Sequence, residues 1–357
     1  MANEPAASGT PLRRGRGLQL STHSPMPEAP AQPDKPVASE HPSLRRGRGL
    51  QLSTQAMPEP TTCTLAQLEA SAPLQRIRLK QGELAYRQAG DGPPLLLIHG
   101  WGASSRYWLG TLAYLAASRT CYAIDLPGFG ASPSVDPAPT LVQLAKLVAE
   151  FTATLGLARY DLNGHSFGAA VAACLAAQQP DRLRRLVITS FGVRPNPLER
   201  TWLGLAQSHA ALMLQASQPL IALARPWLRP LRPLAAQTLS VPPITATVAG
   251  WYVAQMPADG QLLQAGIDDL TQMDVGAHLA CIASIGDPAV VAALRAVQAP
   301  TLFIGGDTDR VVNPDELRAA AALTRGSQVQ TLVQCGHVPM VEQSAAYHSA
   351  LHEFLEG

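Results

Sequence analysis

The chain has 357 residues, of which 46% are hydrophobic and 15% are charged, and its formal net charge is +1. This length suffices for one large α/β domain or two ordinary domains, so we expect a soluble globule with a sizeable core. A charge so near neutral argues against nucleic acid as a partner. The sequence opens with no signal segment, and no apolar run approaches the roughly 18 to 20 residues of a membrane span.

The five cysteines are odd in number, widely spaced and without the spacing of metal ligands. We therefore predict buried free thiols, a reducing and hence cytoplasmic location, and no metal site. No pattern in the sequence indicates an oligomeric state. The cysteines are Cys63, Cys121, Cys174, Cys281 and Cys335.

The first part of the chain contains a duplication, because LRRGRGLQLST occurs at 12–22 and again at 44–54. Proline, serine and glycine dominate around it, no apolar period is present, and two copies are too few for a repeat fold. We therefore predict that residues 1–60 form a disordered tail. Its RGRG runs lack aromatic neighbours on which bases could stack, which argues against RNA binding.

From Gln75 the run RIRLKQGELAYRQAG predicts an antiparallel hairpin with a glycine at its turn. Short β-rich runs then alternate with helix-like segments. The predicted strands are 93–100, 120–126, 159–164, 183–190, 299–306 and 329–336, and the predicted helices are 140–156, 169–180, 314–324 and 343–355. Such alternation predicts an α/β fold whose mostly parallel sheet has helices on both faces and its chemistry at the carboxyl ends of the strands.

The alternation stops between residues 192 and 287, where apolar helical stretches and prolines take over. We predict an inserted helical lid there, with the core formed by 72–191 and 288–357. The segment is rich in Leu, Ala, Trp and Met, which indicates an apolar cleft; alternatively, these side chains form the lid's own core. The run ARPWLRPLRP at 224–233 adds three arginines, which either bind a substrate carboxylate or lie in solvent. They are Arg225, Arg229 and Arg232.

Residues 160–170 read YDLNGHSFGAA and contain the pattern G-x-S-x-G at Gly164, Ser166 and Gly168. In this pattern a strand turns sharply into a helix and holds the serine hydroxyl exposed in a strained backbone conformation. Glycine is needed because a Cβ would collide with the turn. The pattern predicts Ser166 as a nucleophile; the simpler interpretation is a glycine-rich turn with an incidental serine.

A serine is a weak nucleophile until a base takes its proton, and a buried carboxylate must hold that base in one tautomer. Among nine histidines, His337 follows a predicted strand end in the loop before the final helix, from which it can reach the serine. A loop histidine without a catalytic role is the alternative. His165, next to the serine, is expected to point elsewhere. The remaining histidines are His23, His41, His99, His209, His278, His348 and His352.

Asp307 and Asp309 both follow the predicted strand that ends at Gly306, and spacing alone excludes neither as the acid. We favour Asp309 because it stands further past the strand end, before a turn from which it can swing toward His337. Asp307 would then cap or brace the loop. The resulting order of Ser, Asp and His along the chain is the one expected of this architecture.

An acyl-transfer site also needs two backbone N–H groups for the oxyanion, one after the nucleophile and one in the loop after an early strand. Phe167 supplies the first. The run IHGWGAS at 98–104 supplies the second, and Trp101 is the better candidate because glycines flank it. His99 is expected to brace this loop by hydrogen bonds.

Five motifs occur in order along the chain and together resemble those of the α/β-hydrolase fold family. They are HGWG at 99–102, DLPGFGAS at 125–132, GHSFG at 164–168, GGDTDRVVNP at 305–314 and GHVPMVE at 336–342. The resemblance implies an eight-stranded α/β-hydrolase sheet and a Ser166, Asp309, His337 triad without metal or organic cofactor. The serine sets aside the family's haloalkane dehalogenases and epoxide hydrolases, which look for an aspartate there.

We favour a hydrolase that cleaves carboxylic esters or thioesters of small apolar substrates through an acyl-enzyme. The alternatives in another reaction class are a C–C bond hydrolase of a dienoic ketoacid, in which the lid arginines would take part, and a cofactor-free perhydrolase or haloperoxidase. A non-catalytic ligand-binding protein on this fold should show a broken triad, whereas the triad is whole in this sequence.

Overall fold

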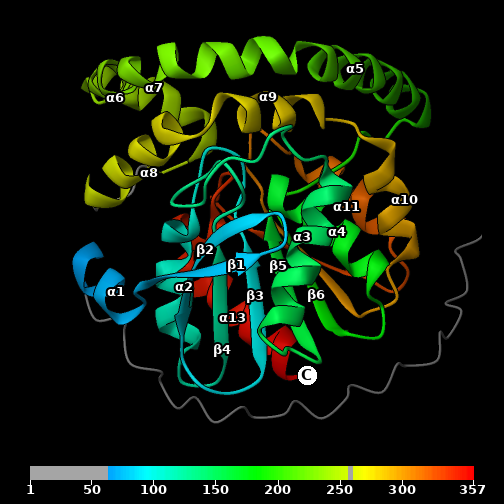
Figure 1. Cartoon of the computed structure of the whole chain (residues 1–357). Helices are drawn as coiled ribbons and strands as arrows, with labels where there is room; N and C mark the ends of the chain where they lie inside the picture. Colours follow the sequence, from blue (N-terminus) through cyan, green and yellow to red (C-terminus); the bar gives the residue numbers. More distant parts are fainter. Residues whose placement is uncertain (1–62, 256–259) are drawn as a thin grey trace, which may run out of the picture. The chain divides into compact units, whose positions relative to one another are not determined.

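The computed structural model describes residues 63–255 and 260–357, so the predicted tail at 1–60 lies outside the described residues. Within them the strands are β1 Leu74–Leu79, β2 Gly82–Ala89, β3 Pro94–Ile98, β4 Thr120–Ile124, β5 Tyr160–His165, β6 Leu183–Thr189, β7 Thr301–Gly306 and β8 Gln328–Leu332. They form one eight-stranded sheet in the order β1-β2-β4-β3-β5-β6-β7-β8 (Figure 1). β1 and β2 form the predicted antiparallel hairpin, and β3 to β8 are parallel. The predicted fold class is confirmed.

Helices cover both faces of this sheet. α3, α4, α10 and α11 lie on one face, and α1, α2, α12 and α13 lie on the other. Their bounds are α1 Leu65–Ser71, α2 Leu109–Leu115, α3 Leu141–Thr154, α4 Phe167–Gln178, α10 Pro288–Ala296, α11 Pro314–Leu323, α12 Pro339–Glu342 and α13 Ser344–Glu356.

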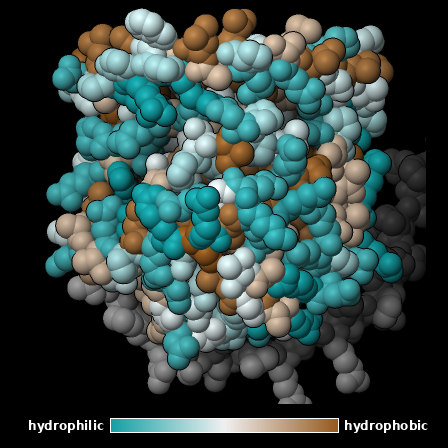
Figure 2. Space-filling view, viewed as in Figure 1, coloured by the Kyte–Doolittle hydropathy of each residue, from teal (hydrophilic) through white to brown (hydrophobic). Residues whose placement is uncertain are grey.

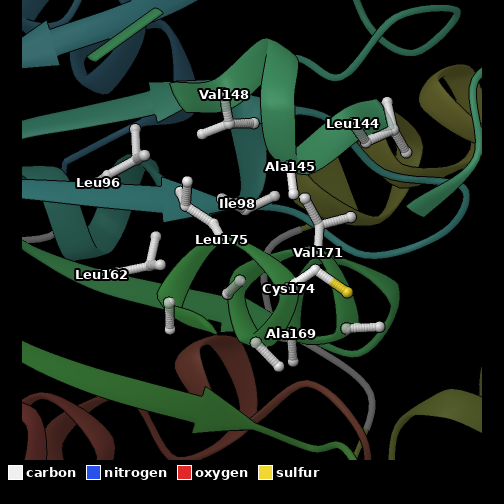
Figure 3. Close-up of a cluster of buried hydrophobic side chains, with 14 of the residues drawn as sticks. Leu96, Ile98, Leu144, Ala145, Val148, Leu162, Ala169, Val171, Cys174 and Leu175 are labelled. Atoms are coloured by element: carbon white, nitrogen blue, oxygen red, sulfur yellow. The ribbon is translucent and has the colours of Figure 1, made fainter. Parts of the chain in front are cut away.

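The central strand β3 supplies side chains to both hydrophobic layers, because successive residues of a strand point to opposite faces. Leu96 and Ile98 pack into the layer under α3 and α4, and Leu95 and Leu97 pack into the layer under α2 and α13. All four are fully buried, and each such side chain stabilises the fold by about 2 kcal/mol. Their neighbours include Leu144, Val148 and Leu175 in the first layer (Figure 3) and Trp108, Leu112 and Tyr347 in the second.

The sequence analysis did not predict the short helices α1, α2 and α10. α1 and α2 have seven residues each and α10 has nine, so their hydrophobic periodicity is too brief to stand out. α1 begins with a capping box between Thr64 and Gln67 and packs Leu65 and Leu68 against the second layer. It therefore precedes the predicted start of the core at residue 72. The T-x-x-Q spacing was the signal that could have located it.

Between β6 and α10, in the segment predicted as a lid, the described residues form five helices that we call the helical layer. They are α5 Pro197–Leu228, α6 Arg232–Leu239, α7 Pro242–Tyr252, α8 Gly260–Gln272 and α9 Val275–Ala283. Figure 1 shows α5, α6 and α7 outermost, with α8 and α9 nearer the sheet. That this layer acts as a lid stays a prediction.

Among the described helices none is, on its own, long and apolar enough to cross a membrane. α9 and α10 pass that test only as a pair, with a bend of 70° between them.

At the amino end of the parallel strands, a buried ion pair ties the last helix to the sheet. Arg119, just before β4, pairs with Asp161 of β5, and both are almost fully buried. Arg119 also donates to the Leu355 carbonyl at 2.6 Å and to the Glu356 carboxylate at 2.7 Å, and Arg184 donates to Asp161 at 3.0 Å. Burial raises the pKa of Asp161, and the neighbouring arginines oppose that shift. Arg119 is therefore the common partner of β5 and the end of α13.

Removal of Arg119 leaves the buried Asp161 carboxylate with Arg184 as its remaining hydrogen-bond partner. Loss of one partner from a buried ion pair costs about 3 to 5 kcal/mol, so we expect Arg119→Ala to lower the free energy of unfolding in urea by about that amount. The matched control is Arg318→Ala, because Arg318 and Asp315 form an exposed pair on α11 that should contribute little. Equal unfolding midpoints for Arg119→Ala and wild type would contradict this role.

Candidate active site

Ser166 lies at the junction of β5 and α4 with backbone angles φ 52° and ψ −118°. A positive φ is strained for a residue other than glycine and persists only where the surroundings enforce it. A Cβ at Gly164 would lie 2.4 Å from the Gly168 carbonyl oxygen, and a Cβ at Gly168 would lie 2.3 Å from the His99 carbonyl oxygen. The two glycines therefore permit the close approach of strand and helix that holds Ser166 in this conformation.

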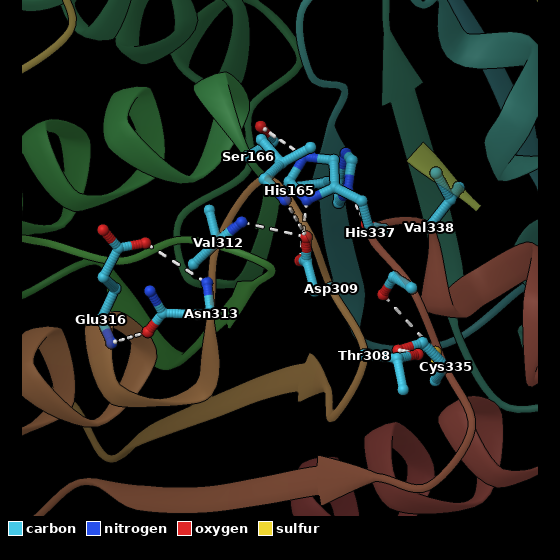
Figure 4. A network of polar contacts seen from close by, with 12 residues as sticks. His165, Ser166, Thr308, Asp309, Val312, Asn313, Glu316, Cys335, His337 and Val338 are labelled. Atoms are coloured by element: carbon cyan, nitrogen blue, oxygen red, sulfur yellow. Dashed lines mark hydrogen bonds and ion pairs between the residues drawn. The ribbon is translucent and has the colours of Figure 1, made fainter. Parts of the chain in front are cut away.

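Ser166, His337 and Asp309 form one hydrogen-bonded line (Figure 4). The Ser166 Oγ lies 3.0 Å from His337 Nε2, and His337 Nδ1 lies 2.8 Å from Asp309 Oδ2. His337 and Asp309 are both buried. The carboxylate accepts a hydrogen bond from the Nδ1–H group, which leaves the Nε2 lone pair free to accept the serine proton. The three side chains thus have the mutual geometry of a nucleophile, a base and the acid that orients it.

The structure brings Asp309, and not Asp307, to the imidazole. The second oxygen of Asp309 accepts from the N–H groups of Val311 and Val312 at 2.8 and 3.0 Å, so the turn after β7 fixes the carboxylate. Asp307 instead accepts from the Cys335 N–H at 3.3 Å. Asp307 therefore braces one loop against another.

The loop of His337 is held by Glu342, a carboxylate that the sequence analysis did not single out. Glu342 Oε2 accepts from the N–H groups of Gly336 at 2.9 Å and Ala254 at 2.6 Å. The His337 N–H donates to the Tyr252 carbonyl oxygen at 2.7 Å. His337 and its loop are thus fixed to the end of α7 in the helical layer. Its place at the end of the GHVPMVE motif was the signal for this glutamate.

His165 is directed at two neighbouring loops and not at the Ser166 hydroxyl. Its Nε2 donates to the His337 carbonyl oxygen at 2.8 Å, and its Nδ1 accepts from the Tyr107 hydroxyl at 3.0 Å. Tyr107 in turn accepts from the Gly100 N–H at 2.6 Å. This arrangement needs a neutral ring, and burial together with the nearby His337 lowers the pKa of His165 to about 3. The neutral ring therefore joins the Gly100 loop to the His337 loop.

His99 braces the loop after β3. Its Nδ1 donates to the Gly100 carbonyl oxygen at 2.8 Å, and its Nε2 accepts from the Leu126 N–H at 2.9 Å. Burial lowers the pKa of His99, which agrees with this neutral, fully hydrogen-bonded ring.

Trp101 and Phe167, the predicted oxyanion donors, both line the cavity that contains Ser166. Phe167 is the first residue of α4, and the N–H groups of a first helical turn have no intrahelical acceptor. The Trp101 indole donates to His278 Nδ1 at 3.2 Å, and burial lowers the pKa of His278, so that nitrogen stays an acceptor. The indole is thereby tied to α9. That the two peptide N–H groups bind an oxyanion stays a prediction.

A cavity of about 1290 Å³ lies between the strand ends and the helical layer, with Ser166 and His337 in its wall. It is larger than the roughly 300 to 1,000 Å³ of most small-molecule sites. Arg106 in the wall pairs with Asp269 at 3.7 Å. The apolar part of the wall includes Phe167, Phe191, Val193, Leu270, Ile282 and Val338. The cavity therefore has room for a long or branched apolar group next to the serine.

The three arginines considered for a substrate carboxylate lie outside the described lining of this cavity. Arg225 is buried and pairs with Asp136 and Asp274. Arg232 donates to a backbone carbonyl, and Arg229 is exposed. They are thus not placed to bind a substrate beside Ser166.

Residues 93–344 match the profile of a family described as alpha/beta hydrolase fold. A pimeloyl-[acyl-carrier protein] methyl ester esterase of Neisseria meningitidis serogroup B is 26% identical over 263 residues, which cover 73% of this chain and 92% of the esterase. The dihydrolipoyllysine-residue acetyltransferase component of the acetoin cleaving system of Cupriavidus necator is 38% identical over 104 residues. That match spans 29% of this chain and only 28% of the acetyltransferase component.

Two solved structures extend these similarities to three dimensions. A membrane phospholipase A described as a bacterial virulence factor has a TM-score of 0.64 and 26% identity, with 82% of this chain and 90% of that chain covered. A carboxylesterase from Bacillus subtilis has a TM-score of 0.59 and 19% identity, with 82% and 95% covered, and shows likeness of fold alone. The matched range contains Ser166, Asp309 and His337. The chain therefore belongs to the α/β-hydrolase family.

Proposed function

We propose that the protein hydrolyses carboxylic esters of apolar acyl groups through an acyl-enzyme on Ser166. The observation that carries this proposal is the line of Ser166, His337 and Asp309, which opens on a large, mainly apolar cavity. The similarity to a methyl ester esterase over 92% of that protein supports the same class of reaction.

In the first half-reaction, Ser166 Oγ attacks the ester carbonyl carbon while His337 Nε2 takes the hydroxyl proton. The carbonyl oxygen becomes an oxyanion that faces the N–H groups of Trp101 and Phe167. The Asp309 carboxylate stabilises the imidazolium. The proton then passes from Nε2 to the alkoxy oxygen as the C–O bond breaks, so an alcohol leaves and the acyl group stays on Oγ.

In the second half-reaction, a water molecule attacks the acyl carbon and gives a proton to His337 Nε2. The collapse of the second tetrahedral species returns that proton to Ser166 Oγ and releases the carboxylic acid. His165 does not compete for these protons near neutral pH, because its pKa is lowered to about 3. A thioester reacts at the same carbonyl carbon, so the proposal includes thioesters.

The alternatives have less support. The C–C bond hydrolase interpretation relied on Arg225, Arg229 and Arg232, and these lie outside the described cavity lining. No specific observation in the described structure favours a perhydrolase or a haloperoxidase. A non-catalytic binding protein would not need the intact line at Ser166. The cytoplasmic location stays a prediction; four of the five cysteines are buried, and all five are free thiols.

We expect Ser166→Ala to fold normally and to lower ester turnover by about 10⁶-fold, because no other hydroxyl occupies the end of the line. The matched control is Ser190→Ala: Ser190 also has a positive φ, of 47°, and its buried hydroxyl has no hydrogen-bond partner in the described structure. That control should keep wild-type turnover. Near-normal p-nitrophenyl ester hydrolysis by Ser166→Ala would refute the nucleophile.

We expect Asp309→Asn to lower turnover by about 10⁴-fold, because an amide presents the wrong partner to the imidazole. Asp307→Asn should be nearly silent, because an asparagine oxygen can still accept the hydrogen bond from Cys335. Turnover and thermal melting of both variants separate rate from folding. If Asp307→Asn were the inactive, well-folded variant, the orienting acid would be misassigned.

The size and apolarity of the cavity predict that turnover rises from short to long acyl chains. The measurement is kcat/KM for p-nitrophenyl esters from acetate to palmitate, run beside a dienoic ketoacid. A single added methylene should improve kcat/KM by up to about fourfold while the cavity has room, from roughly 0.8 kcal/mol of burial. A preference for acetate with palmitate rejected would contradict the cavity argument, and faster cleavage of the ketoacid would favour the C–C interpretation.

A further inference from the structure

The outer surface of the helical layer is unusually apolar. On α5 six large apolar side chains are between 58% and 78% exposed: Trp202, Leu212, Met213, Leu220, Leu223 and Trp227. α6 and α7 add Leu234 and Trp251, which are 63% and 64% exposed. Figure 2 shows hydrophobic residues gathered along the upper edge, where Figure 1 places these three helices. We call this surface the outer face.

The apolar residues of α5 form an ordered stripe. At 3.6 residues per turn, the six named side chains fall within an arc of about 100°. The opposite side of α5 carries Ile221 and Arg225, which are buried against the rest of the molecule. A surface helix ordinarily presents polar residues to water on its outer side. The outer side of α5 thus has the composition that is typical of a binding surface.

The charges on this surface are mostly positive. From Thr201 to Val253 the sequence holds three arginines and no aspartate, glutamate or lysine. Arg225 is neutralised by Asp136 and Asp274. Arg229 is exposed and Arg232 is partly exposed, and both follow the C-terminal end of the α5 stripe. Glu199, exposed in the first turn of α5, is the one acidic side chain of that helix. The outer face is therefore apolar, with a positive margin at the C-terminal end of α5.

We propose that the outer face binds an anionic lipid surface, with α5 lying in the plane of the headgroups. Helices of this kind combine Trp and Leu on one side with arginine near the interface, and both classes of side chain suit the boundary between acyl chains and headgroups. α5 has 32 residues, so it would lie along about 48 Å of that surface.

Charge complementarity favours lipid over a second copy of the chain as the occupant. In a two-fold contact the same patch faces itself, so Arg229 and Arg232 of each copy would meet Glu199 as the one carboxylate that α5 of the other copy offers, which leaves a shortfall of negative charge. Anionic headgroups supply that negative charge, and each arginine near such a surface adds to the binding. The inference does not depend on the chemistry assigned to Ser166.

The test is co-sedimentation of the full chain with vesicles, in the Ser166→Ala background so that no lipid is cleaved. The chain with an unchanged outer face should bind phosphatidylcholine vesicles that contain phosphatidylglycerol. The triple substitution Trp202→Gln, Leu220→Gln and Trp227→Gln should weaken that partition by at least about tenfold. None of the three lines the cavity, and all are well exposed, so thermal melting should be unchanged.

Two controls isolate the outer face. Val333→Gln removes an apolar side chain that is 71% exposed after β8, outside the helical layer, and should bind like wild type. Arg229→Gln should weaken binding about fivefold on phosphatidylglycerol vesicles and leave binding to pure phosphatidylcholine unchanged. The basic runs at 12–22 and 44–54 are present in every variant, so they do not affect the comparison.

Three results would overturn the proposal. The first is a wild-type chain that stays in the supernatant with anionic vesicles. The second is a triple variant that binds as tightly as wild type, which would assign any binding to another part of the chain. The third is a dimer in light scattering that the triple substitution dissociates while vesicles bind neither form, which would make the outer face a contact between copies.

Discussion

The candidate site depends on the contact between β5 and α4, where neither Gly164 nor Gly168 has room for a Cβ. This approach sets the start of α4 against the carbonyl of His99 in the loop after β3. It holds Ser166 at φ 52° and leaves the first N–H groups of the helix without intrahelical partners beside the hydroxyl. A larger residue at either glycine would have to displace α4 or β3. One contact therefore both limits the packing of the core and sets the backbone geometry of Ser166.

A neutral histidine and a carboxylate hold the loop and the ring of His337. His165 connects the Gly100 loop, through Tyr107, to the backbone of His337, and its lowered pKa keeps it uncharged near neutral pH. A protonated ring there would repel the imidazolium that the proposed reaction forms on His337. The carboxylate that contacts the imidazole is that of Asp309, which two backbone N–H groups hold in place. In the proposed reaction, positive charge would therefore develop on His337 next to that carboxylate.

The sequence predicted those features that leave a local mark. Gly164 and Gly168 mark the turn at Ser166, and the alternation of strands and helices predicted an α/β fold with a mostly parallel sheet. Asp307 and Asp309 were not separable by spacing, because both follow β7; the turn N–H groups that select Asp309 are a three-dimensional property. The GHVPMVE motif marks Glu342, but the bond from Ala254 to Glu342 spans 88 residues of sequence, so the motif alone does not reveal that partner. The break in alternation located the helical layer but not which of its surfaces would be apolar.

The helical layer meets the core through polar contacts around a cavity. Arg225 of α5 binds Asp136 in the loop before α3, and Asp269 of α8 accepts from the Ser104 hydroxyl at 2.6 Å. Between these anchors lies the cavity, so the apolar inner side of the layer is only partly covered by protein. The apolar stripe on its outer side contributes no hydrophobic free energy to folding, because these side chains remain exposed to water in the folded chain. Both sides of the layer can therefore gain hydrophobic free energy by binding other molecules. On the inner side the proposed molecule is an acyl chain beside Ser166. On the outer side it is the lipid surface that would present that chain.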